Sequence, residues 1–279
     1  GFVNQDLVAK ADESNIVNYA NNQLVSLQSG YQLVFTNRGG LSLFNLDTDE
    51  EVWYALNNDG DRVQGAKQAY MQPDGNFVLY ENPVEDLTKN GTSENGLLWS
   101  SNTFGKNNSL GLSKDGFLAI IDSETQIGKV LYSSKEEILL QNSQALSLPD
   151  NPSILFGDYK LILTEEGGLS LIDIETQQEL WFATKDDQRV TGAKQAFMQP
   201  DGNLVLYEKP VEDLKKNGTS ENIPIYSSGT LNFGSKAKLI LSRDGFLYID
   251  HENSDEIKLL TSWRPEGIAD NQYETFKLN

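Results

Sequence analysis

The chain has 279 residues, 38% of them hydrophobic, with 23 glycines and a formal net charge of −19. This composition is typical of a turn-rich globular protein, and the charge disfavours phosphate backbones and anionic membranes as partners. The chain has no cysteine and one histidine, so disulfides are excluded and a zinc site would lack its usual ligands. We therefore expect no nucleic-acid partner, no membrane insertion, and no metal or other cofactor.

Short strand–turn–strand units follow one another along the chain, each made of two apolar runs that flank a glycine-containing turn. They begin at Leu33, Tyr70 and Leu110 in the first half, and at Leu161, Phe197 and Leu239 in the second. Many are followed by another short run that ends in an aromatic residue: Trp53, Trp99, Tyr132, Trp181 and Tyr226. This pattern predicts an all-β sandwich, barrel or prism. We expect three sheets per half around one axis, with these aromatic side chains meeting inside.

The two halves of the chain are copies of each other. Residues Val63–Asn95 and Val190–Asn222 differ at only five of 33 positions, whereas the preceding segments, Tyr31–Arg62 and Tyr159–Arg189, differ at more than half. This predicts two domains, residues 1–148 and 149–279, of which the second carries the C-terminal tail. The alternative is a single β-propeller ring of six repeats, because the strands recur about every 40 residues.

The middle unit of each half combines a strong turn signal, Pro73-Asp74-Gly75 in the first, with a row of polar side chains. Alternation along the outgoing strand directs Phe77 and Leu79 to the core and presents the opposite face to a ligand. A sugar hydroxyl both donates and accepts, so a carboxylate, two amides and a phenol suit a hexose, and valine can cover its C–H surface. The predicted sugar-binding residues are Gln72, Asp74, Asn76, Val78 and Tyr80, and Gln199, Asp201, Asn203, Val205 and Tyr207.

Both sets resemble the QxDxNxVxY mannose motif of the monocot mannose-binding lectins, the snowdrop-type or bulb-type family. The resemblance implies two tandem β-prism II domains, each of three short antiparallel sheets around a pseudo-threefold axis. It also implies a non-catalytic agglutinin for α-D-mannose, in which Asp and Asn read the 2-hydroxyl, Gln the 3-hydroxyl and Tyr the 4-hydroxyl. The outer repeats lack the amides, so we interpret them as structural; in the first repeat the aligned residues are Thr36, Arg38, Gly40, Ser42 and Phe44, and in its copy Thr164, Glu166, Gly168, Ser170 and Ile172.

These observations predict a lectin for mannose or mannose-rich glycans on glycoproteins or cell surfaces, secreted or at the cell surface, and not an enzyme. Each site should be weak, about millimolar, with strength recovered by avidity. A homodimer is possible because open sheet edges often pair. A lectin-like toxin or bacteriocin of the same fold is the alternative within the family.

An acidic loop follows each predicted site, Glu81–Leu87 and Glu208–Leu214. Because its near-identity persists where the flanks have diverged, we predict a wall that extends recognition beyond one sugar; the alternative is a solvated insertion. Shortly after the loops come the sequons of Asn90 and Asn217, and another lies at Asn107. Turn formation by Asn-Gly is the favoured explanation of the first two.

Overall fold

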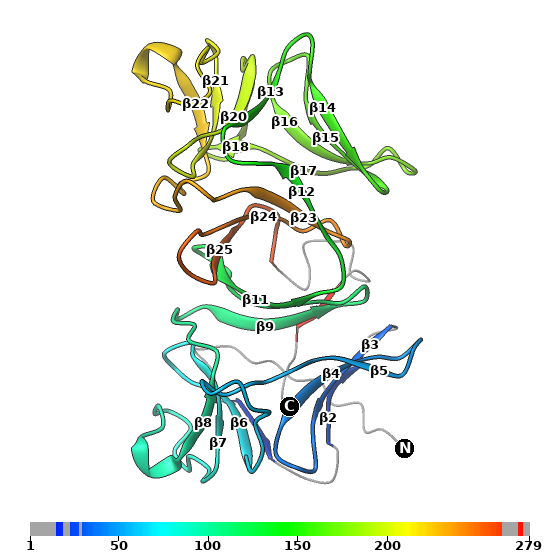
Figure 1. Ribbon diagram of the computed structural model, residues 1–279, viewed down its shortest axis with the longest axis vertical. Coiled ribbons are helices and arrows are strands. Elements are labelled where there is room, and N and C mark those ends of the chain that lie inside the picture. Colours follow the sequence, from blue (N-terminus) through cyan, green and yellow to red (C-terminus); the bar gives the residue numbers. More distant parts are fainter. Residues whose placement is uncertain (1–14, 19–22, 28–29, 264–272, 276–279) are drawn as a thin grey trace. The chain divides into compact units, whose positions relative to one another are not determined.

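The computed structural model describes residues 15–18, 23–27, 30–263 and 273–275 (Figure 1). They form two compact units. The first contains the chain up to Ser134 together with Trp263 and β26 (Tyr273–Thr275), and the second contains Lys135–Thr261. The described residues hold strands and two 3-10 turns, η1 (Ser93–Asn95) and η2 (Ser220–Asn222), but no α-helix. The predicted all-β class is confirmed.

The first unit consists of three antiparallel sheets, each built on one of the predicted hairpins (Figure 1). The first has β2 (Gln23–Leu27), β3 (Tyr31–Phe35), β4 (Leu41–Asn45) and β5 (Glu50–Tyr54); the second has β1 (Asn15–Asn18), β6 (Gln68–Met71), β7 (Phe77–Tyr80) and β8 (Leu97–Ser100); the third has β26, β9 (Asn108–Ser113), β10 (Phe117–Asp122) and β11 (Ile127–Ser133).

The second unit repeats this plan. Its sheets contain β14 (Ser153–Phe156), β15 (Tyr159–Leu163), β16 (Leu169–Asp173) and β17 (Glu179–Phe182); β13 (Gln144–Ser147), β20 (Gln195–Met198), β21 (Leu204–Tyr207) and β22 (Pro224–Ser227); and β12 (Glu136–Leu140), β23 (Leu239–Ser242), β24 (Leu247–Asp250) and β25 (Glu256–Leu259). A small ribbon, β18 (Thr184–Lys185) with β19 (Gln188–Arg189), completes it.

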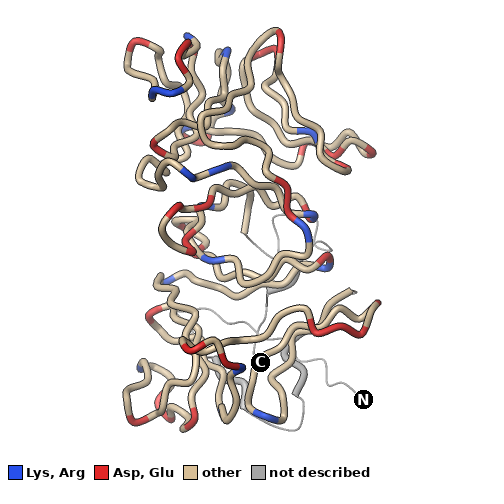
Figure 2. The backbone as a smooth tube through the Cα atoms, in the orientation of Figure 1, with Lys and Arg blue, Asp and Glu red and all other residues tan. Residues whose placement is uncertain are grey.

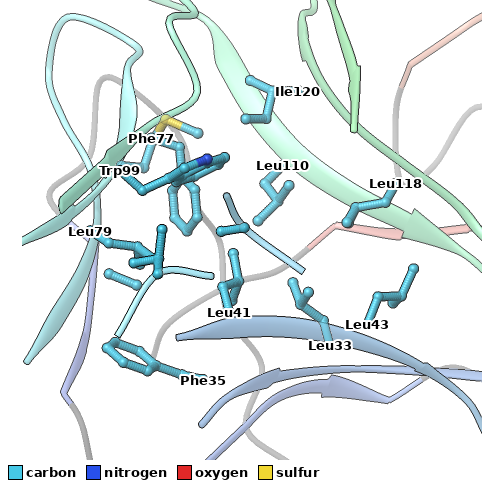
Figure 3. Packing of buried hydrophobic residues seen from close by; sticks show 14 of the residues in the cluster. Leu33, Phe35, Leu41, Leu43, Phe77, Leu79, Trp99, Leu110, Leu118 and Ile120 are labelled. Carbon is cyan, nitrogen blue, oxygen red and sulfur yellow. The ribbon is translucent and has the colours of Figure 1, made fainter. Parts of the chain in front are cut away.

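One apolar core joins the three sheets of the first unit (Figure 3). Its side chains include Leu33 and Leu43 from the first sheet, Phe77 and Leu79 from the second, and Ile120 from the third. Phe77 and Leu79 therefore point inward, as alternation along β7 predicts. Burial of each large apolar side chain contributes about 1.5–3 kcal/mol.

The aromatic residues at the strand ends line this interior. The rings of Trp53 and Trp99 meet edge to face with centroids 6.2 Å apart, and Tyr132 packs on the same cluster. A core shared by three sheets is the predicted prism arrangement, and the two compact units confirm the tandem β-prism fold class. The alternative of one six-bladed propeller ring is wrong.

The compact units are bounded differently from the predicted domains, 1–148 and 149–279. Strand β12 pairs with β23 and β13 pairs with β20, so the chain from Lys135 belongs with the second unit. Conversely, the Trp263 indole N–H donates to the Ser109 backbone carbonyl at 3.3 Å, and β26 pairs with β9, so both group with the first unit. Of the predicted C-terminal tail, residues 264–272 and 276–279 lie outside the described residues.

Acidic residues are scattered through both units, with the basic residues interspersed among them (Figure 2). In the described part of the chain, no helix is long and apolar enough to cross a membrane. Within the same residues, no group of three or more histidine or acidic side chains is arranged to hold a metal ion.

Candidate functional site

The Pro-Asp-Gly segment forms a tight turn between β6 and β7. The Gly75 N–H donates to the Gln72 carbonyl at 2.9 Å, and the Gln72 N–H donates to the Asn76 carbonyl at 3.0 Å. Gly75 has φ +88°, and a Cβ there would collide with the backbone of Gly105. Glycine is therefore required both for the backbone conformation and for the close approach.

The turn brings the polar side chains of the predicted site together. The Gln72 amide donates to the Asp74 carboxylate at 3.3 Å, and the Tyr80 hydroxyl donates to Gln72 Oε1 at 2.5 Å. Asp74 Oδ1 also accepts the Asn76 backbone N–H at 2.9 Å.

The second unit repeats these contacts. There, Gln199 donates to Asp201 at 3.2 Å, the Asn203 backbone N–H donates to Asp201 at 2.9 Å, and the Tyr207 hydroxyl donates to Gln199. The predicted side chains thus converge in both halves of the chain.

These side chains are largely buried, which differs from the expected open face. Gln72, Asn76 and Tyr80 are 4%, 8% and 4% exposed, and Val78 is 1% exposed; only Asp74 is half-buried. In the second unit Asp201 is again half-buried while the other four residues are buried. The Asp carboxylate is therefore the member of each set that is most accessible from solvent.

The segment after β7 covers the predicted site. We call residues 81–96 the covering loop; its counterpart in the second unit is 208–223. Val84 is buried against Tyr70, Val78 and Tyr80. The Gln68 side chain accepts the Val84 N–H at 2.8 Å and donates to its carbonyl at 3.2 Å. Leu87 packs on the same cluster. The base of the covering loop is therefore anchored by apolar packing and by a buried amide.

The tip of the covering loop, Asn90–Thr92, lies on the polar side chains themselves. The Gly91 N–H donates to Gln72 Oε1 at 2.8 Å, and Asn90 Oδ1 accepts the Asp74 backbone N–H at 3.2 Å. Gly91 lies so close to the Tyr80 ring that a Cβ at this position would overlap it. Thr92 then caps η1.

The corresponding tip of the second unit repeats this arrangement. Gly218 N–H donates to Gln199 Oε1 at 2.9 Å, and Asn217 Oδ1 accepts the Asp201 backbone N–H at 3.1 Å. The covering loop thus packs on the motif through its tip and through Val84 in the first unit and Val211 in the second. That it extends recognition beyond one sugar stays a prediction. Its acidic residues, such as Glu85 and Asp86, are exposed.

Hydrogen bonds from β8 and the residues after it hold the second amide of the site. The Asn76 side-chain nitrogen donates to Ser100 Oγ at 2.9 Å, while its oxygen accepts the Ser101 hydroxyl at 3.2 Å and the Thr103 N–H at 3.3 Å. Asn203, Ser227, Ser228 and Thr230 repeat this network. These serines and threonines were not predicted as part of the site, although their Ser-Ser-x-Thr spacing is present in both halves.

Burial changes the acidity of the phenol. Desolvation raises the pKa of the Tyr80 hydroxyl above its usual value, and the nearby Asp74 carboxylate raises it further. Desolvation and Asp201 raise the pKa of Tyr207 in the same way. Both phenols therefore remain hydrogen-bond donors at neutral pH.

No protein-family model matches the chain, and no curated protein matches it. Solved structures similar to the chain include a two-domain fetuin-binding agglutinin from Scilla campanulata, with 18% identity over 93% of this chain and 98% of that one, at a TM-score of 0.29. A monomeric mannose-binding lectin from Gastrodia elata shows 22% identity over 44% of this chain and 95% of that one, at a TM-score of 0.32. The mannose-specific agglutinin of snowdrop bulbs, Galanthus nivalis, shows 20% identity over 48% of this chain and 99% of that one, at a TM-score of 0.30.

Proposed function

We propose that the protein is a non-catalytic lectin that binds α-D-mannose, or glycans containing it, at two motif sites of β-prism II type. The observation that carries this proposal is the same hydrogen-bonded set, Gln72–Asp74–Tyr80 and Gln199–Asp201–Tyr207, built independently in both units. A secreted or cell-surface location, where glycans are displayed, belongs to the same proposal.

The covering loop determines how a sugar would enter. Gln72 Oε1 accepts the Gly91 N–H, and the Asp74 backbone N–H is taken by Asn90. A sugar that uses Gln72 and Tyr80 must displace this tip, whereas the half-buried Asp74 carboxylate can accept a first hydroxyl from the rim. Opening the tip frees the polar side chains from their bonds to the loop, whereas Val84 at the anchored base stays packed on Val78 and Tyr80.

Displacement weakens binding without abolishing it. Each hydrogen bond between the tip and the motif contributes about 1 kcal/mol, so opening the tip costs about 2 kcal/mol. This lowers the apparent affinity about 30-fold relative to an open site. Attachment to a target that displays several mannose residues recovers part of this loss through the second site.

Isothermal titration calorimetry with methyl α-D-mannoside tests the proposal. The parent chain should bind two sugars, Asp74→Ala and Asp201→Ala one each, and the double variant none. Asp115→Ala is the matched control, because Asp115 occupies the aligned turn position of the third repeat and should leave both sites intact. A double variant that still binds two mannosides, or a parent that shows no saturable binding, contradicts the proposal.

A further inference from the structure

A polar cavity of about 380 Å³ lies on the first sheet of the first unit. It is lined by residues of β4 and β5, by the turn before β4, and by residues 62–64. Its lining includes Thr36, Arg38, Ser42, Glu51, Arg62 and Gln64. Thr36, Arg38, Gly40 and Ser42 align with the Gln, Asp, Asn and Val positions of the motif, and all four line the cavity. The sequence predicts that this first repeat is structural. The place that aligns with the motif is nevertheless an open cavity here, whereas the motif itself is covered by its loop.

An ion pair forms one wall of the cavity. Both terminal nitrogens of Arg62 donate hydrogen bonds to the Glu51 carboxylate, one of them at 2.9 Å. The guanidinium lies 3.7 Å above the Tyr54 ring centroid. The hydrogen bond from Arg62 holds the pKa of Glu51 below its usual value, with a further contribution from Ser42. Ser42 is 1% exposed, so a buried hydroxyl stands behind an oriented pair of charges. Such preorganised polar groups are typical of a ligand site.

The second unit repeats the ion pair although its flanking sequence has diverged. Arg189 donates to Glu179 at 2.9 and 2.5 Å, the Ser170 hydroxyl donates to Glu179 at 2.8 Å, and the guanidinium lies 3.7 Å above the Phe182 ring. More than half of the aligned positions around these residues differ between the halves. The serine, the glutamate and the arginine are thus retained in both copies while most of their neighbours differ. This indicates that both units require the same ion pair with its hydroxyl.

The charge around the pair differs between the units. In the first, Arg38 and Arg62 oppose Glu51, which leaves one net positive charge on the cavity wall of a strongly acidic chain. In the second, glutamates 165 and 166 stand at the positions aligned with Asn37 and Arg38. The Glu166 charge reaches the guanidinium, because it contributes to raising the pKa of Arg189. The two copies therefore offer opposite fields to an anion.

We propose that the cavity of the first unit binds an acidic sugar, a pyranose ring bearing a carboxylate, and that the second unit excludes it. Arg38, which is exposed and lines the cavity, takes the carboxylate together with the outer face of Arg62. The Glu51 carboxylate accepts hydrogen bonds from the ring hydroxyls, and the Gln64 amide both donates to them and accepts from them. The volume, at the small end of ligand pockets, fits one ring. This site does not depend on the mannose motif.

Titration with methyl β-D-glucuronide and with methyl β-D-glucoside, which carries a neutral hydroxymethyl group in place of the carboxylate, tests the proposal. The parent chain should bind one glucuronide, at least tenfold more tightly than the glucoside, and increasing NaCl should weaken the binding. Arg38→Glu, which installs the residue of the second unit, should lower glucuronide affinity at least tenfold. Because the second unit accommodates glutamate there, this variant is expected to fold. The combined change Glu165→Asn, Glu166→Arg and Thr191→Gln, which installs the first unit's residues at the three aligned positions, should raise the stoichiometry to two.

Several results would overturn the proposal. They are equal affinity for the two glycosides, no saturable glucuronide binding by the parent, or a glucuronide affinity that Arg38→Glu leaves unchanged. A stoichiometry of one after the exchange in the second unit would also refute the role of this charge. Sodium acetate is the matched anion without a ring, and acetate binding as tight as glucuronide binding would refute a sugar site. Methyl α-mannoside binding by Arg38→Glu should equal that of the parent, so failure here is distinguishable from failure at the motif.

Discussion

Replacing Gly91 by alanine should expose the sugar site of the first unit. The added Cβ would overlap the Tyr80 ring, so the tip of the covering loop must move away from the motif. The backbone at Gly91 is not among the positive-φ positions, so alanine fits the chain conformation and the clash is the only obstacle. The tip then loses the Gly91–Gln72 and Asn90–Asp74 hydrogen bonds, at 2.8 and 3.2 Å.

The magnitude follows from these two bonds. At about 1 kcal/mol each, they hold the tip closed by about 2 kcal/mol. A site that no longer has to open gains this free energy, so the affinity for methyl α-mannoside should rise by up to about 30-fold. The same change should lower the free energy of unfolding of the first unit by about 2 kcal/mol.

Calorimetry in an Asp201→Ala background isolates the first site and makes the comparison direct. Gly218→Ala in the same background is the matched control, because it opens a site that already lacks its carboxylate and should leave the affinity of the first site unchanged. An unchanged or weaker affinity in Gly91→Ala, with urea unfolding confirming a folded chain, would refute the idea that the tip and the sugar compete for Gln72.

Three further predictions concern stability. The raised pKa values of Tyr80 and Tyr207 contribute stability that is present below about pH 10 and is lost as the pH rises through the folded-state pKa values. Urea unfolding should therefore show a lower free energy of unfolding at strongly alkaline pH than at neutral pH. The double variant Tyr80→Phe with Tyr207→Phe should reduce this difference. The lowered pKa of Glu51 contributes stability that is present above about pH 4.3 and is lost as the pH falls through the folded-state pKa. Glu51→Gln should therefore weaken the fall of the urea unfolding midpoint at acidic pH. The same fall in parent and variant would show that the ion pair does not stabilise the fold. Leu79→Ala, at a fully buried position, should cost about 2–5 kcal/mol in urea unfolding, whereas Leu97→Ala at a 54% exposed position should change stability by less than about 0.5 kcal/mol; similar values for the two would place Leu79 outside the core.

The hairpins and their inward faces follow from the sequence because they depend on local rules. Alternation along β7 places Phe77 and Leu79 in the core and Val78 and Tyr80 on the other face. The duplication likewise predicts that what is built around Asp74 is built again around Asp201. These features need only neighbours along a strand and a turn.

The covering loop could not be predicted from such rules, because it depends on packing between residues far apart in the chain. Gly91 is placed by its contact with Tyr80 and Gln72, and Val84 by the side chain of Gln68. The domain boundary has the same origin, since β12 is assigned by its pairing with β23, about a hundred residues later. The Arg62–Glu51 pair did leave a signal in the sequence, because both residues persist in a segment where most others differ.

The competition between loop and sugar can be observed directly at two backbone amides. In a ¹⁵N–¹H NMR titration with methyl α-D-mannoside, the Gly91 and Gly218 signals should move and saturate together with those of the Gln72 and Gln199 side-chain amides, because the sugar releases their hydrogen bonds. Saturable binding that leaves both glycine amides unchanged would show that the sugar binds elsewhere, and the motif would then be a structural latch for its own loop.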